Sequence, residues 1–223
     1  IRLNSSLFSS DYSDMQVSGF GGAGFIVGNA AESQVRGLES DVVIALTDNI
    51  TVNGAFAYLD ATFKDYATAA CSVGQINGPN PASPMAGSTC EANGGFQDLS
   101  GERMQFSPEF AGNLGVSYEA GLNNSMNIAL QFDALYTDDI VIAPDNDAAV
   151  IQPAYWKFNA RAALHSNNGD WMVALVGKNL TDKATFNWGN DATTSELGFG
   201  YENAYFHHIE APRNIEIQGR YNF

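Results

Sequence analysis

Apolar and polar residues alternate one by one along most of this sequence, and this period of two limits the possible fold more than any other feature. In the segment "RNIEIQGRYNF", Ile215, Ile217, Tyr221 and Phe223 fall on one side, and charged or amide residues fall on the other. Because successive side chains of a β-strand point to opposite faces, this pattern predicts a strand with one apolar and one polar face. The alternation recurs from end to end, and helical periodicity is hard to find. We expect an all-β protein with about eight antiparallel strands, in segments 1–17, 36–46, 50–58, 106–118, 126–136, 156–164, 171–178 and 215–223.

The connections between these segments alternate in length. Outer-membrane barrels place short turns at one end and long loops at the other, and their strands have about 9–11 residues. The alternation therefore predicts an antiparallel transmembrane β-barrel. A soluble β-sandwich is the alternative, but its apolar faces would need a second sheet to cover them. Short connections are expected at 47–49, 119–125 and 167–170, and long ones at 18–33, 64–105, 137–155 and 179–208.

Aromatic residues fall near the ends of the expected strands, where a barrel meets the two membrane interfaces. We expect one girdle on the side of the short turns and a second on the side of the long loops. The first would contain Tyr118, Trp171, Tyr221 and Phe223, and the second Tyr58, Phe63, Tyr136 and Trp156.

The charge balance excludes some partners. The chain has 10 Lys and Arg against 25 Asp and Glu, a formal net charge of −15. Nucleic acids and anionic bilayer surfaces attract basic patches, so neither is an expected partner. No run of about 18 apolar residues predicts a transmembrane helix. The sequence begins without Met or a signal peptide, so we expect a mature or partial chain whose upstream portion is missing.

The two cysteines, Cys71 and Cys90, lie in one segment rich in Gly, Pro, Ser and Asn. An even count within one loop favours a disulfide and an oxidising compartment. Two separate thiols are the alternative, and a zinc pair is disfavoured because no histidine is near.

Four phrases of the sequence resemble the C-terminal barrel portion of TonB-dependent outer-membrane receptors. They are "SQVRGLESDVVIALTDNITVNGAFAYLDATFKDY" at 33–66, "RMQFSPEFAGNLGVSY" at 103–118, "VALVGKNLTDK" at 173–183 and "APRNIEIQGRYNF" at 211–223. The resemblance implies a 22-stranded barrel in the outer membrane of a Gram-negative bacterium, filled by an N-terminal plug. Residues 1–223 would be its C-terminal part, without the plug and the N-terminal barrel strands. It also implies that the terminal aromatics Tyr221 and Phe223 form the signal for barrel assembly.

The same resemblance implies a function. Receptors of this kind import scarce nutrients such as iron–siderophore complexes, cobalamin or glycans, and the plug contacts the energy-transducing TonB complex. The partners expected are thus outer-membrane lipid, the missing plug and barrel strands, TonB through the plug, and a small nutrient ligand. The alternatives are a passive porin-like small barrel and a surface-binding or adhesin β protein.

No arrangement of residues predicts an enzyme. His165, His207 and His208 have no nucleophile at a recognisable spacing, and the glycines form no phosphate-binding loop. The segment "DNDAA" at 145–149 lacks the further ligands that a calcium loop requires. We predict no cofactor and no metal site.

Two sets of residues are candidates for function. On the polar strand faces, residues toward the lumen or plug are expected, although any barrel wall needs polar residues there. In the last long loop, aromatic and histidine side chains could stack on a flat chelate or a sugar ring, or else belong to the external girdle. The lumen set is Glu39, Asp41, Glu109, Asp133, Lys157, Arg161, Glu216 and Arg220, and the loop set is Trp188, Tyr201, Tyr205, Phe206, His207 and His208.

Overall fold

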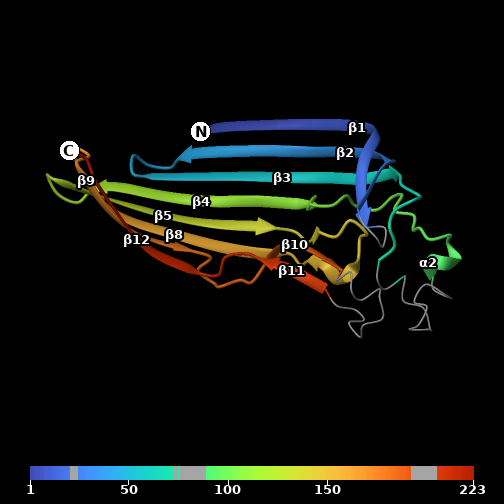
Figure 1. Ribbon diagram of the computed structural model, residues 1–223. Helices are drawn as coiled ribbons and strands as arrows, with labels where there is room; N and C mark the ends of the chain where they lie inside the picture. Colours follow the sequence, from blue (N-terminus) through green and yellow to red (C-terminus); the bar gives the residue numbers. More distant parts are fainter. Residues whose placement is uncertain (21–24, 73–74, 76–88, 192–204) are drawn as a thin grey trace.

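The computed structural model describes residues 1–20, 25–72, 75, 89–191 and 205–223. Within these residues, eight strands form one antiparallel sheet in the order β1-β2-β3-β4-β5-β8-β9-β12 (Figure 1). The all-β prediction is therefore confirmed. The strands are β1 Arg2–Phe20, β2 Phe25–Ala45, β3 Ile50–Asp65, β4 Phe110–Gly121, β5 Met126–Thr137, β8 Tyr155–Ser166, β9 Trp171–Lys178 and β12 Asn214–Tyr221.

The register gives the sheet one apolar face and one mainly polar face. Val116 of β4 is opposite Phe132 of β5, while the next pair along the same strands is Gly115 and Asp133. The apolar face has no protein cover in the described chain, and Ile217 there is 79% exposed. A soluble sheet covers such a face with a second layer, whereas a barrel in a membrane leaves it to lipid. The described residues contain no helix long and apolar enough to cross a bilayer.

The connections lie at two ends of the sheet according to their length (Figure 1). The turns β2–β3, β4–β5 and β8–β9 lie at one end, together with the C-terminus. The described parts of the connections 66–109, 138–154 and 179–213 lie at the other end, as the alternation predicted. These longer connections contain α2 Thr89–Ala92, β6 Ile140–Val141, η1 Ala148–Val150, β7 Ile151–Gln152, β10 Phe186–Asp191 and β11 Tyr205–Ile209.

Several predicted boundaries are wrong, and the strand predicted at 50–58 continues to Asp65. The connection predicted at 18–33 is mostly strand, because β1 and β2 stay paired as far as Phe20 and Phe25. The strand predicted from Phe106 begins only at Phe110. Phe106 instead has a left-handed backbone (φ 55°), and its N–H donates to Val141 O in the neighbouring connection. Its segment thus belongs to the loop layer.

The predicted girdle residue Phe63 is also misplaced. It shares a β3 face with Ala61 and is buried, because connection 66–109 folds over it. The resulting cluster, here called the loop core, contains Phe63, Tyr66, Ala69 and Leu99, with Met15, Val17 and Met104 packed against it.

Other aromatic positions agree with the girdles. On the long-loop side, the rings of Tyr136 and Trp156 lie 5.0 Å apart, and those of Tyr58 and Phe110 lie 5.1 Å apart. On the short-turn side, Tyr221 is opposite Trp171 in the register.

The predicted disulfide is confirmed. Cys71 and Cys90 are bonded, and Cys90 is buried at the start of α2. The connection that contains them is also fastened to connection 138–154. Arg103 forms an ion pair with Asp139, and the Gln105 side chain donates to Ile142 O at 2.9 Å. The two long connections therefore form one joined layer.

Candidate functional site

The aromatic segment predicted as a ligand loop contains a β-hairpin, formed by β10 and β11. Its register pairs Trp188 with His208, Gly189 with His207, and Asn190 with Phe206. A register shift between Phe186 and Trp188 marks an irregularity in β10. Because strand side chains alternate, the hairpin has two distinct faces.

One face packs against connection 138–154. Phe186 and Tyr205 contact the buried cluster of Ile142, Ala143 and Val150. Gly189 permits this close approach, since a Cβ there would lie 2.8 Å from Val150 Cγ1. Any larger residue at this position would push the hairpin away from its support.

The other face is open. Trp188 and Phe206 are 48% and 41% exposed, and their ring centroids lie 5.0 Å apart. His208 Nδ1 lies 2.8 Å from Asn187 Oδ1, and because an amide oxygen accepts, Nδ1 donates. We call Trp188, Phe206 and His208 the aromatic face. Side chains of this kind can stack on a planar or ring-shaped ligand.

The structure thus divides the six predicted loop residues. Trp188, Phe206 and His208 come together. Tyr205 packs on the opposite side, and the His207 ring lies 4.2 Å from the ring of Phe186. Tyr201 lies outside the described residues.

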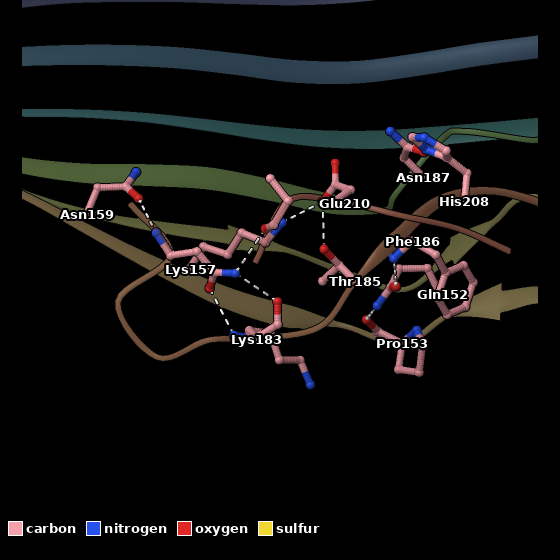
Figure 2. A network of polar contacts seen from close by, with 12 residues as sticks. Gln152, Pro153, Lys157, Asn159, Lys183, Thr185, Phe186, Asn187, His208 and Glu210 are labelled. Atoms are coloured by element: carbon pink, nitrogen blue, oxygen red, sulfur yellow. Dashed lines mark hydrogen bonds and ion pairs between the residues drawn. The ribbon is translucent and has the colours of Figure 1, made fainter. Parts of the chain in front are cut away.

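A polar network fixes the hairpin to the barrel wall (Figure 2). Glu210 follows β11, and its Oε2 accepts from Lys157 Nζ of β8 at 2.5 Å and from Thr185 Oγ1 at 2.6 Å. Its N–H donates to Thr185 O at 2.9 Å. The bond from Lys157, followed by that from Thr185, holds the pKa of the Glu210 carboxyl below its ordinary value. Glu210 is therefore charged where it meets the wall.

Residues 179–183, with the sequence "NLTDK", join the two ends of the connection 179–213. Asn179 is buried and has a left-handed backbone (φ 49°), which Asn tolerates better than most residues. Its Oδ1 accepts from Lys183 N at 2.9 Å, and its N–H donates to Asn159 Oδ1 of β8 at 2.9 Å. Asp182 Oδ1 accepts from Arg213 N at 2.8 Å, so the outgoing and returning segments are joined.

A groove of about 570 Å³ lies on the polar face of the sheet, beside this network. The predicted lumen residues Asp133, Lys157 and Arg161 line it, together with Glu210 and Asn179. Sequence reasoning missed Glu210, Thr185 and Asn179. The phrase "NLTDK" was the available signal for Asn179, whereas Glu210 and Thr185 stood in no recognisable pattern.

The remaining lumen residues lie elsewhere on the sheet. Glu39 and Asp41 are on β2, Glu216 and Arg220 are on β12, and Glu109 directly precedes β4. Two of them have partners on neighbouring strands. Asp41 accepts from the Asn4 side chain at 3.0 Å, and Glu216 lies 3.7 Å from Lys178 Nζ. No three His, Cys, Asp or Glu side chains in the described parts are grouped to hold a metal ion.

Residues 1–180 match the family described as TonB dependent receptor-like, beta-barrel. The chain belongs to this family. A comparison with curated protein sequences found no significant match. Proteins of this receptor family are outer-membrane β-barrels of Gram-negative bacteria, and they are transport receptors rather than enzymes. The antiparallel sheet is accordingly a segment of a transmembrane barrel wall.

Solved TonB-dependent receptor structures share the fold. The ferric yersiniabactin uptake receptor FyuA from Yersinia pestis has a TM-score of 0.70 and 12% identity, covering 99% of this chain and 27% of that chain. The siderophore receptor PiuA from Acinetobacter baumannii has a TM-score of 0.62 and 19% identity, covering 97% and 25%. The ferric preacinetobactin receptor BauA from the same organism has a TM-score of 0.58 and 14% identity, covering 97% and 26%. The chain thus spans about a quarter of the length of these receptors.

In a receptor barrel, the two faces of the sheet have different surroundings. The apolar face meets lipid, and the polar face is turned toward the interior. The groove and the lumen residues lie on the second face, and the register places Asp133 opposite Asn159. Contact of these side chains with a plug stays a prediction from the sequence.

Proposed function

We propose that this chain supplies barrel wall and external loops to a receptor that imports an iron–siderophore complex across the outer membrane, driven by TonB. The family assignment supports nutrient uptake, and siderophore receptors recur among the similar structures. TonB coupling would act through the N-terminal plug that the family resemblance implies.

The observation that carries the proposal is the aromatic face. It presents two exposed rings and a histidine on a hairpin at the long-loop end of the wall. Its reverse side is packed and its base is tied to β8, so the rings are held in place before any ligand arrives. Preorganisation of this kind reduces the entropic cost of binding. We propose that the aromatic face makes the first contact with the ligand.

Uptake of iron tests this proposal. The receptor containing this chain would be expressed in cells that lack their own siderophore receptors, and uptake of ⁵⁵Fe would be measured with a panel of ferric siderophores. We expect uptake of at least one complex, abolished when TonB is deleted. Uptake that persists without TonB would instead indicate a passive channel.

A double variant tests the role of the aromatic face. Trp188→Ala with Phe206→Ala should raise the half-saturating concentration about tenfold, because two stacking contacts are lost. Phe96→Ala is the matched control, since Phe96 is an equally exposed ring in another long connection. An equal effect of both variants would mean that the aromatic face has no special role.

A further inference from the structure

The pair formed by Lys157 and Glu210 links two parts of the receptor that are distant in sequence. Lys157 lies within β8 of the wall, whereas Glu210 directly follows β11 of the aromatic hairpin. Glu210 also accepts from Thr185, which lies just before β10. One carboxylate therefore joins the two ends of the hairpin to the wall (Figure 2).

The surroundings make this link stronger than an ordinary surface ion pair. The Lys157 side chain is 20% exposed and that of Glu210 is 31% exposed. Thr185 is buried, so its hydroxyl is held in place as a second donor. A charged hydrogen bond that is partly shielded from water loses more when one partner is removed than an exposed pair does. Without the Glu210 carboxylate, the charge of Lys157 would have no partner. Movement of the chain that lets water reach the Lys157 ammonium group would then be favoured.

The position of the link connects the two candidate regions of the site. Glu210 lies two residues beyond His208 of the aromatic face, and both Glu210 and Lys157 line the groove on the polar face of the sheet. A displacement of Glu210 would thus move the aromatic rings relative to the groove. Other titratable or charged side chains near the pair are Asp133 on β5, Arg161 on β8, Lys178 on β9 and His208 on β11.

We propose that Glu210 is a positioning residue that, through Lys157, fixes the aromatic face relative to the groove and allows the hairpin to move when the pair is broken. This inference rests on the proposed uptake function for its biological meaning. The geometry that it asserts can be tested without any ligand.

Distance measurements between spin labels test it in the complete receptor in lipid vesicles. One label replaces Ile209, which is exposed on the hairpin, and the other replaces Leu122, which is exposed in the β4–β5 turn. Both Glu210→Gln and Lys157→Met should shift the mean distance and broaden its distribution. The double variant should show no more change than either single variant, because both remove the same interaction.

Two controls separate positioning from general damage. Glu216→Gln removes the same charge from a carboxylate 3.7 Å from Lys178 and should leave the distribution unchanged. The charge-swapped pair Lys157→Glu with Glu210→Lys should restore the narrow distribution. Rescue by the swap is not expected if Glu210 acts only as the acceptor for Thr185, because lysine cannot accept that hydrogen bond.

The pH dependence of the distance in the spin-labelled receptor that keeps Lys157 and Glu210 gives an independent test. Because the pKa of Glu210 is lowered in the folded protein, the pair should persist through the usual titration range of Glu and break as the pH falls further. The distance should therefore broaden reversibly at acid pH, and Glu210→Gln should remove that dependence. A distribution unaffected by acid, by Glu210→Gln and by Lys157→Met would overturn the proposal. Because no ligand is involved, this result is distinguishable from failure of iron uptake.

Discussion

Tyr66 combines burial with an ionisable hydroxyl in the loop core. Its ring lies 5.0 Å from that of Phe63, and its N–H donates to Ser100 Oγ at 2.9 Å. Burial raises the pKa of its phenol above the ordinary value of 10.0. The folded loop core therefore binds the phenolic proton more tightly than the unfolded chain does.

This shift predicts an alkaline loss of stability in the connection 66–109. The contribution of Tyr66 should be complete below about pH 10 and disappear as the pH rises through the higher folded value. Hydrogen exchange in this connection, measured between neutral and strongly alkaline pH, would report it. Tyr66→Phe should flatten the alkaline part of the profile, whereas Tyr12→Phe, at an exposed position, should leave it unchanged. A profile that is the same in Tyr66→Phe and in the unaltered chain would contradict the prediction.

Among the elements, the wall strands could be predicted because their pattern of side chains depends only on residues that are neighbours in the sequence. In Met126–Thr137 the faces follow from alternation alone, and the bounds of this strand and of Trp171–Lys178 were predicted almost to the residue. Phe63 was misplaced because its surroundings come from a connection that returns more than thirty residues later, as the contact with Leu99 shows. The candidate site was harder to predict, because its contacts also join residues that are distant in the sequence. Aromatic composition indicated a candidate binding loop but no hairpin, and only the β10–β11 pairing shows that Tyr205 and Phe206 face opposite ways.

The disulfide constrains a single connection between two strands. It joins Cys71 to Cys90 across a sequence separation of 19 residues, next to α2. On the chain-entropy model, a closed loop of this size is worth about 3 kcal/mol. The wall has its own hydrogen-bonded ladder, so reduction should loosen the connection 66–109 and leave the sheet intact.

Limited proteolysis of the assembled receptor would test this separation. Under reducing conditions, or in the variant Cys71→Ser with Cys90→Ser, cleavage should be faster within this connection alone. Cleavage within the wall strands, or loss of the whole barrel after reduction, would show that the disulfide supports more than its own loop.

At the scale of the whole molecule, the register predicts that a new charge costs much more free energy on one face of a strand than on the other. Ile217 of β12 is opposite Leu175 on the apolar face, and Gln218 is opposite Ala174 on the polar face. Arginine on the lipid face of a barrel costs about 2–4 kcal/mol near the bilayer centre, whereas interior positions tolerate it. Ile217→Arg should therefore lower the free energy of unfolding by about that amount, and Gln218→Arg should change it little.

Equilibrium unfolding of the assembled receptor in lipid vesicles would measure both variants side by side. The comparison uses adjacent residues, so the distance from the turns is nearly matched. A similar penalty at both positions would mean that the two faces have similar surroundings and that the barrel interpretation of this sheet is wrong. A large difference in the expected sense would place lipid against Ile217 and would extend the two-faced pattern from one strand to the wall as a whole, because the register ties every strand to its neighbour.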